Sequence, residues 1–148
     1  MNKQYTVYLC GPIAGCDDNE AHDWRDYVNG ELSYNGLFRC LDPMRRDYRN
    51  THNVGQNEEG LPWEIVKEII ELDKRDITES DVLLANLLPQ KKAVGSNMEI
   101  MYAWTQGKLV VLVVPEGSSV SPWHRYHAQK VVHTLDDAIR YIQNGNWQ

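Results

Sequence analysis

Two acidic side chains in this 148-residue sequence stand where a carboxylate is unusual, and the first is Asp73. A helix is expected over 63–80, and its apolar stripe is formed by Val66, Ile69, Ile70 and Ile77. At about 100° per residue, Asp73 falls near the middle of that stripe, whereas Asp76 falls toward its edge, where we expect a solvated side chain. A buried ion costs several kcal/mol unless it is paired. Asp73 is therefore either a structural partner of a neighbouring group or a functional residue.

The second unusual carboxylate is Glu99. The run Ser96-Asn97-Met98-Glu99 is S-x-x-E ahead of apolar residues, which is typical of a capping box in which Glu99 folds back onto the backbone N–H of Ser96. Alternatively, Glu99 lies in the first turn of a helix whose positive end faces a ligand, which keeps the carboxylate ionised and nucleophilic. The local pattern favours the capping box. Glycoside chemistry uses two carboxylates, one as nucleophile and one as acid or base, and Asp73 is available as the second.

The loop Gly11-Pro12-Ile13-Ala14-Gly15 follows an expected strand, where a phosphate or ribose loop would lie. It matches neither GxGxxG nor the Walker pattern, so a dinucleotide-binding fold is not supported. A tight turn between strand and helix explains its glycines equally well. Tyr8 precedes the loop on the strand, and most such tyrosines are core residues whose hydroxyl reaches a partner. A carboxylate partner would give Tyr8 a functional role.

Strands alternate with helices along the chain. The expected strands are 5–10, 37–41, 81–88, 109–114 and 130–133. The expected helices are one that begins at Asp17 or Asp18 and ends before Asn35-Gly36, and three over 63–80, 96–106 and 135–144. This alternation predicts one α/β domain over 1–148, a flavodoxin-like (Rossmann-like) three-layer α/β/α sandwich with a five-stranded parallel sheet in the order 2-1-3-4-5. Ligands of such sheets bind beyond the carboxyl ends of the strands.

One long segment fits neither a strand nor a helix. Residues 42–60 are polar, rich in Arg and Asn, and too numerous for an ordinary connection. We expect them to form a lid over a ligand pocket at the carboxyl edge of the sheet.

Composition narrows the class of partner. The chain has 21 acidic and 15 basic residues and a net charge of −6, which argues against binding through the nucleic-acid backbone and favours a small molecule. The cysteines, Cys10, Cys16 and Cys40, have neither CxxC nor zinc spacing, so we expect no disulfide framework, no structural metal and a reducing cytoplasm. The longest apolar stretch, 109–114, is too short to cross a bilayer, and we expect a soluble protein.

Several segments, taken in order, resemble the nucleoside 2-deoxyribosyltransferase family. The resemblance is carried by 8–15 (YLCGPIAG), Trp24-Arg25, Asp73, Asp81 within Ser80-Asp81-Val82, and 95–103 (GSNMEIMYA) ahead of Gly107-Lys108. These segments extend over most of the chain, roughly from residue 5 to residue 114.

The resemblance implies a retaining mechanism at the anomeric carbon. Glu99 would attack C1′ of a 2′-deoxynucleoside and displace the base, and a second base or water would then take the sugar from the glycosyl-enzyme ester. Asp73 matches the family aspartate that binds the base and manages its proton, and Tyr8 matches the tyrosine that positions the nucleophile. The further substrate-binding positions it implies are Gly11, Pro12, Ile13, Ala14, Trp24, Asp81, Gly95, Ser96, Asn97 and Met98.

The chain also departs from the family pattern. Transferases of this family often carry an aspartate six residues before the nucleophile, and related N-hydrolases often carry a serine there, whereas this chain has Ala93. The neighbouring Lys91 and Lys92 could meet a 5′-phosphate or be simply solvated. The family completes its active sites with a neighbouring subunit's C-terminal loop. In this chain that loop would be 121–124, with Trp123 and His124 as substrate-binding residues.

We therefore expect a cytoplasmic homo-oligomeric enzyme that transfers deoxyribose between nucleobases without metal or cofactor. Its partners would be nucleosides or nucleotides and free bases, not nucleic acid or membranes. One alternative is an N-glycosidase that hydrolyses 2′-deoxynucleoside 5′-monophosphates through the same ester. A further alternative is a non-catalytic protein that binds a nucleotide signal.

Overall fold

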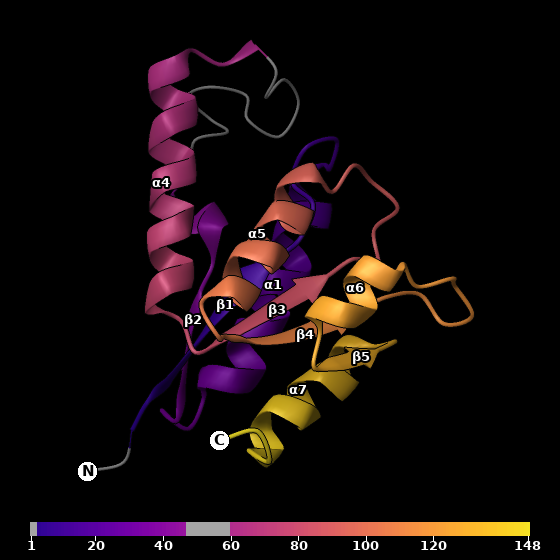
Figure 1. Cartoon of the computed structure of the whole chain (residues 1–148). Coiled ribbons are helices and arrows are strands. Elements are labelled where there is room, and N and C mark those ends of the chain that lie inside the picture. The colour runs from indigo at the N-terminus through magenta and orange to yellow at the C-terminus, as the bar shows by residue number, and fades with distance from the viewer. Residues whose placement is uncertain (1–2, 47–59) are drawn as a thin grey trace.

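The computed structural model describes residues 3–46 and 60–148, which form a five-stranded parallel sheet flanked by helices (Figure 1). The strands are β1 (Tyr5–Cys10), β2 (Phe38–Leu41), β3 (Val82–Asn86), β4 (Leu109–Val113) and β5 (Lys130–Val132). Their order across the sheet is β2-β1-β3-β4-β5, and every neighbouring pair is parallel. The predicted flavodoxin-like order is confirmed.

Helices cover both faces of the sheet (Figure 1). They are α1 (Asp18–Ser33), α4 (Trp63–Glu79), α5 (Val94–Thr105), α6 (Pro122–His127) and α7 (Leu135–Asn144), with a short 3-10 helix, η1 (Pro43–Arg45). The buried residues of α1 and α7 pack on one face, and those of α4 and α5 pack on the other. Side chains of a strand alternate between faces, so Val7 and Leu9 face α1 and α7 while Tyr8 and Cys10 face α4 and α5.

Helix α1 begins as the sequence predicts. The side chain of Asp17 accepts a hydrogen bond from the backbone N–H of Glu20 at 2.8 Å, and Glu20 Oε1 accepts one from the backbone N–H of Asp17 at 3.3 Å. These two bonds form a complete capping box, which satisfies backbone donors that a helix start leaves unpaired.

Several predicted boundaries move by one or two residues. Strand β3 covers 82–86 rather than 81–88. At its ends the side chain of Asp81 accepts the backbone N–H of Thr6, and the side chain of Asn86 accepts that of Leu88. Strand β2 begins one residue later than 37, β4 ends one residue before 114 and β5 ends one residue before 133.

The expected loop over 121–124 is wrong, because these residues start helix α6. Ser121 caps the helix by accepting the backbone N–H of Trp123 at 3.2 Å, and Pro122 occupies the first helical position, where its missing N–H costs nothing. The Ser-Pro pair was the signal in the sequence for this helix start.

Only the first part of the expected lid falls within the described residues. Residues 42–46 comprise η1 and its flanks, with Asp42 accepting the backbone N–H of Met44 at 2.7 Å. The rest of the lid expectation concerns 47–59, which lie outside the described residues. Among the helices of 3–46 and 60–148, none combines the length and apolar character needed to cross a membrane.

Candidate active site

Glu99 points from α5 toward strand β1, where two side chains donate to its carboxylate. The hydroxyl of Tyr8 donates to Oε2 at 2.5 Å, and the thiol of Cys10 donates to Oε1 at 3.5 Å. Tyr8 and Cys10 are buried, whereas Glu99 is only partly buried. Each oxygen of the carboxylate is thus held in place by a donor from β1.

The capping box that the local S-x-x-E pattern favours at Ser96 is absent, in agreement with the alternative that the family resemblance favours. Helix α5 begins at Val94, two residues earlier than expected, with Ala93 at the cap position and no side chain capping the helix. Glu99 consequently lies in the second turn rather than the first, and its carboxylate bonds to Tyr8 and Cys10. Because the helix dipole weakens beyond the first turn, those two donors replace it as the main support for a negative charge.

The pKa of the Glu99 carboxyl is raised by burial and lowered by the hydrogen bonds from Tyr8 and Cys10 and by the charge of Arg25, with a net upward shift. Burial and the adjacent negative charge of Glu99 raise the pKa of Tyr8 well above its ordinary value. Tyr8 therefore stays protonated at neutral pH and remains a donor to Glu99.

Asp73 projects from α4 and interacts electrostatically with both Glu99 and Tyr8. Its side chain is 21% exposed. Burial and the charge of Glu99 raise its pKa to about 8, although Arg46 opposes the shift. Two carboxyl groups that are close together cannot both ionise easily, so the pair holds a proton near neutral pH. Asp73 keeps that proton, because Glu99 has donors that stabilise its charge.

The sequence pattern predicts a solvated Asp76, but in the structure this side chain is buried. Its side chain is 2% exposed and accepts hydrogen bonds at 2.8 Å from Nη2 of Arg45 and, with both oxygens, from Nη2 of Arg46. A carboxylate can be buried at this depth because two guanidinium groups neutralise it. The two arginines come from η1 and its C-cap, about thirty residues earlier, so no helical periodicity could reveal them.

The 11–14 loop lies at the carboxyl end of β1 and is held from below by Arg25. This fully buried side chain donates to the backbone carbonyls of Leu9, Gly11 and Ala21. A Cβ on Gly11 would come within 2.8 Å of the Trp24 ring and 3.1 Å of a backbone oxygen, so only glycine fits at this close approach. Gly11 and Pro12 are buried, while Ile13 and Ala14 are partly exposed at the carboxyl edge.

Trp24 lies in the core on the α1 face of the sheet rather than beside Glu99. Any effect of Trp24 on a substrate must therefore pass through the loop that it supports. Asp81 lies even further away, at the amino end of β3, where it pairs with Lys3 and with the backbone N–H of Thr6. The opposite edge of the sheet is the ligand edge in this class of fold. The structure thus separates Asp81 from the other residues singled out in the sequence and places Trp24 against Gly11 of the loop rather than beside Glu99.

The first turns of α5 contribute the remaining positions. The carbonyl of Ser96 lies 3.7 Å from the Cys10 sulfur, which ties the helix start to β1. Gly95, Asn97 and Met98 are exposed. Oδ1 of Asn97 is hydrogen-bonded at 2.8 Å to Nε2 of His124, so α6 of the same chain is attached beside the candidate site.

Trp123 is 73% exposed on α6, and its ring stacks on His127 with centroids 5.8 Å apart. Burial and the proximity of His127 lower the pKa of His124, so His124 is neutral at physiological pH. Trp123 and His124 therefore present an aromatic and a neutral polar group next to the start of α5.

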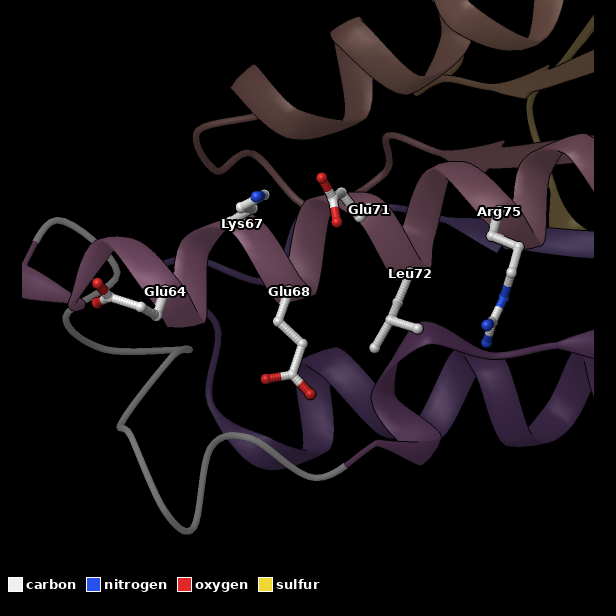
Figure 2. A pocket seen from close by; sticks show the side chains of 6 residues that line it. All are labelled: Glu64, Lys67, Glu68, Glu71, Leu72 and Arg75. Atoms are coloured by element: carbon white, nitrogen blue, oxygen red, sulfur yellow. The ribbon is translucent and has the colours of Figure 1, made fainter.

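A hollow of about 480 Å³ lies against one face of α4 (Figure 2). It is lined by Glu64, Lys67, Glu68, Glu71, Leu72 and Arg75. Residues at these three- and four-residue spacings share one side of a helix, and Asp73 lies on the opposite side. The hollow is thus distinct from the carboxylate pair, and its excess of acidic groups does not suit a phosphate.

A second hollow, of about 450 Å³, lies at the amino edge of the sheet and includes Asp81, Lys3 and Trp147. Among residues 3–46 and 60–148, no group of three or more His, Cys, Asp and Glu side chains is arranged to hold a metal ion.

Sequence reasoning missed three contributors to the carboxylate pair: Cys10, Arg46 and Asp76. Cys10 had a detectable signal, because it lies two positions after Tyr8 on a strand and so shares its face. The pairing of Asp76 with Arg46 had no signal in the sequence, because the two residues lie on different elements about thirty residues apart.

Solved structures share this fold and its parallel sheet. The 2-deoxyribosyltransferase of Bacillus psychrosaccharolyticus matches with a TM-score of 0.71 at 15% identity, over 92% of this chain and 91% of that chain. The 2-desoxiribosyltransferase of Leishmania mexicana gives 0.67 at 18% identity, over 96% and 99%. A CMP N-glycosidase of Clostridium botulinum gives 0.59 at 14% identity, over 93% and 98%. The fold is therefore that of the 2-deoxyribosyltransferases.

Sequence similarity defines the family within that fold. The family described as "Nucleoside 2-deoxyribosyltransferase like" matches residues 4–117. A nucleoside deoxyribosyltransferase of Lactobacillus johnsonii is 48% identical over 40 residues, which make up 27% of this chain and 27% of that relative's length. The chain belongs to the nucleoside 2-deoxyribosyltransferase-like family, which confirms the resemblance seen in the sequence.

Proposed function

We propose that the protein cleaves the N-glycosidic bond of 2′-deoxynucleosides and transfers the deoxyribose to another nucleobase. Membership of the nucleoside 2-deoxyribosyltransferase-like family supports chemistry of this kind. The observation that carries the proposal is the Glu99 carboxylate, held by donors from Tyr8 and Cys10, with the carboxyl group of Asp73, whose pKa is raised to about 8, in its neighbourhood.

In the first half-reaction, an oxygen of Glu99 attacks C1′ of the nucleoside. The C1′–N bond breaks, its electron pair goes to the base, and Asp73 gives that base a proton. The product is a free base and an ester between Glu99 and the sugar. In the second half-reaction, a nitrogen of the acceptor base attacks C1′, Asp73 takes the proton from that nitrogen, and Glu99 leaves as a carboxylate. Two displacements retain the configuration at C1′.

The surroundings of the two carboxyl groups suit these roles. A nucleophile must be ionised, and Glu99 has two hydrogen-bond donors that favour its charged form. A general acid must hold a proton near neutral pH, and the pKa of about 8 at Asp73 meets this condition. When the surroundings favour the charged form of one carboxyl group and the neutral form of the other, one site can use the same functional group both as nucleophile and as acid.

Hydrolysis of 2′-deoxynucleoside 5′-monophosphates is the second candidate, and the similarity in fold to a CMP N-glycosidase is the observation that favours it. Ala93, at the cap position of α5, matches neither the aspartate that transferases of the family often carry nor the serine of the related N-hydrolases, so it does not separate the two candidates. The structural neighbour from Clostridium botulinum is named a CMP N-glycosidase, so a protein of this fold acts on a nucleotide. Lys91 does not stand free for a phosphate, since its Nζ lies 3.7 Å from a carboxylate oxygen of Glu20.

We further propose that the enzyme is a cytoplasmic homo-oligomer whose subunits share active sites. The three free cysteines agree with a reducing compartment. Two exposed aromatic side chains on α6, Trp123 and Tyr126, and exposed Met98 on α5 would be covered by a neighbouring copy.

Product analysis separates the candidates. The protein is incubated with deoxynucleosides and, separately, with their 5′-monophosphates, each with and without a competing base, and the products are resolved by chromatography. We expect the exchanged nucleoside to form faster than free deoxyribose. Release of free sugar at the same rate with and without the added base would indicate hydrolysis instead of transfer. Binding without any cleavage would favour the signal-binding alternative.

The same assay tests the nucleophile. Glu99→Gln keeps the size of the side chain but removes the anionic oxygen, so we expect turnover to fall by about 10³-fold or more while the fold is retained. Glu79→Gln changes an exposed glutamate at the end of α4 and should leave turnover unchanged. Near-normal activity of Glu99→Gln would contradict the ester mechanism.

A further inference from the structure

The buried carboxylate of Asp76 fixes the guanidinium group of Arg46 in one orientation. Nη2 of Arg46 donates at 2.8 Å to both oxygens of Asp76, and Nη2 of Arg45 donates to one of them at 2.8 Å. Because Asp76 is 2% exposed and Arg46 is 16% exposed, water competes little for these bonds. A charge-assisted contact of this length limits the movement of both partners.

The second nitrogen of the same guanidinium faces Asp73. Nη1 of Arg46 lies 3.6 Å from Oδ1 of Asp73. Nη1 is buried and has no hydrogen-bond acceptor within the part of the chain that the structure describes. One side of Arg46 is therefore fully used by Asp76, and the other side keeps a donor and a positive charge directed at Asp73.

We propose that Arg46, fixed by the buried Asp76, is a positioning residue for Asp73 that supplies a permanent positive charge against its carboxyl group. This inference rests on the proposed function, in which Asp73 gives a proton in one half-reaction and takes it back in the other. A carboxyl group surrounded only by acidic neighbours would hold its proton too firmly to give it up. A fixed cation beside Asp73 favours the charged form and makes both transfers accessible.

The charged groups around Asp73 support this assignment. Burial is the largest influence that raises the pKa of Asp73, and Glu99 from α5 raises it further. Arg46 is the strongest influence that lowers it; Asp76 on α4 raises it and Arg45 on η1 lowers it, each to a lesser extent. Tyr8 from β1 also faces Asp73 electrostatically. Arg46 is thus the main counterweight to the burial and to Glu99.

A direct titration of Asp73 tests the proposal without any need for turnover. Carboxyl carbons of aspartate are labelled with carbon-13 and followed by NMR against pH, and the Asp73 signal is assigned by its loss in Asp73→Asn. Arg46→Met should raise the pKa of Asp73 by about one unit or more, since an adjacent opposite charge is worth about 1–3 units. In Arg46→Lys, which keeps the charge, the pKa of Asp73 should stay close to its wild-type value.

Arg45→Met is the matched control. It removes the same charge from the adjacent residue, which shares Asp76 as a partner but forms no ion pair with Asp73. We expect a clearly smaller rise of the Asp73 pKa than in Arg46→Met. Equal shifts in the two variants would reduce the effect to general charge removal and overturn the proposal, as would an unchanged Asp73 pKa in Arg46→Met. Should Arg46→Met fail to fold, Arg46→Gln removes the charge and keeps a donor.

Kinetics then connect the titration to the reaction. The basic limb of the kcat/KM profile should move to higher pH in Arg46→Met by the same amount as the Asp73 pKa. A shifted pKa with an unmoved limb would show that Asp73 is not the acid and would overturn its catalytic positioning. A wild-type protein that cleaves no nucleoside would refute the proposed function, while the NMR titration would still decide whether Arg46 acts on Asp73.

Discussion

The carboxyl groups of Asp73 and Glu99 differ in their immediate surroundings. Glu99 receives hydrogen bonds from Tyr8 and Cys10, both of which favour its ionised form. Burial and the charge of Glu99 oppose the ionisation of Asp73, and the charge of Arg46 favours it. Because the surroundings differ in this way, we expect the proton of the pair to reside on Asp73, which suits the different chemical roles proposed for the two residues.

Asp73→Asn should show a pH-dependent gain in stability. The pKa of Asp73 is raised from 3.8 to about 8 by folding, so the folded protein binds this proton more tightly than the unfolded chain. The resulting destabilisation is absent below about pH 4, grows as the pH rises, and is complete above about pH 8. Asparagine never ionises, so the free energy of unfolding of Asp73→Asn relative to wild type should increase across this range.

Urea denaturation at several pH values checks this expectation. Asp23→Asn, at an exposed aspartate of α1, serves as the control and should give a difference that changes little with pH. Turnover of Asp73→Asn should fall by about 10²–10⁴-fold, because the amide cannot transfer the proton. A stability difference that is constant with pH would contradict a raised pKa at Asp73.

At the scale of elements, the site depends on two connections between segments that are distant in the sequence. Tyr8 and Cys10 on β1 meet Glu99 on α5, about ninety residues later. Arg45 and Arg46 at η1 meet Asp76 on α4, about thirty residues later. The sheet supports the first connection, because β1 is an interior strand paired with β2 and β3, and α5 packs on the same face of the sheet as Tyr8 and Cys10. The second connection depends on one buried carboxylate.

Asp76→Ala should therefore destabilise the protein strongly. It leaves two guanidinium groups without their buried partner, and we expect the free energy of unfolding to fall by about 2–4 kcal/mol, somewhat less than for a fully enclosed pair because Arg45 is partly exposed. Asp76→Asn keeps an acceptor and should lose less. Lys3→Met, which removes the exposed ion pair with Asp81, should change stability by less than about 0.5 kcal/mol. Urea unfolding curves for the three variants provide the comparison, and equal losses for Asp76→Ala and Lys3→Met would contradict the anchoring role.

For the whole molecule, the exposed aromatic surface lies next to the site rather than far from it. The bond between His124 and Asn97 fixes α6 against the start of α5, and Trp123 beside it remains exposed. If a neighbouring copy covers this surface, Trp123 of one subunit lies close either to Glu99 of the other subunit or to Glu99 of its own. The proposed sharing of active sites requires that it lies close to Glu99 of the other subunit.

Subunit mixing tests this arrangement. Glu99→Gln lacks the nucleophile and Trp123→Ala lacks the donated side chain, so each should be nearly inactive alone. Co-expression of the two chains under different affinity tags should restore part of the activity, because some sites then combine an intact Glu99 with an intact Trp123. Tyr34→Ala removes an aromatic side chain that is also exposed but follows α1, and should remain fully active. Full activity of Trp123→Ala alone, or no recovery on mixing, would contradict shared sites.

The sequence by itself determined the order of the strands and of helices α1, α4, α5 and α7, the parallel sheet and the family, but it did not predict helix α6. Alternation of apolar residues is a local property that strands and helices obey wherever they are placed, so β1, α1, α4 and α7 appear close to their predicted bounds. The same periodicity directed Asp73 toward the interior of the molecule, where it is largely buried. Motifs spread over most of the chain singled out Glu99 and Tyr8, which the structure places in contact.

Tertiary structure alone decided what those side chains bind. The S-x-x-E pattern predicted a bond from Glu99 to its own helix, but donors from β1 compete for the carboxylate, and their burial makes them the stronger partners. Helical spacing placed Asp76 at the edge of the stripe, because periodicity cannot register two arginines that approach from another element. Charge pairing depends on distance in space rather than in sequence, and only the folded chain brings these groups within reach.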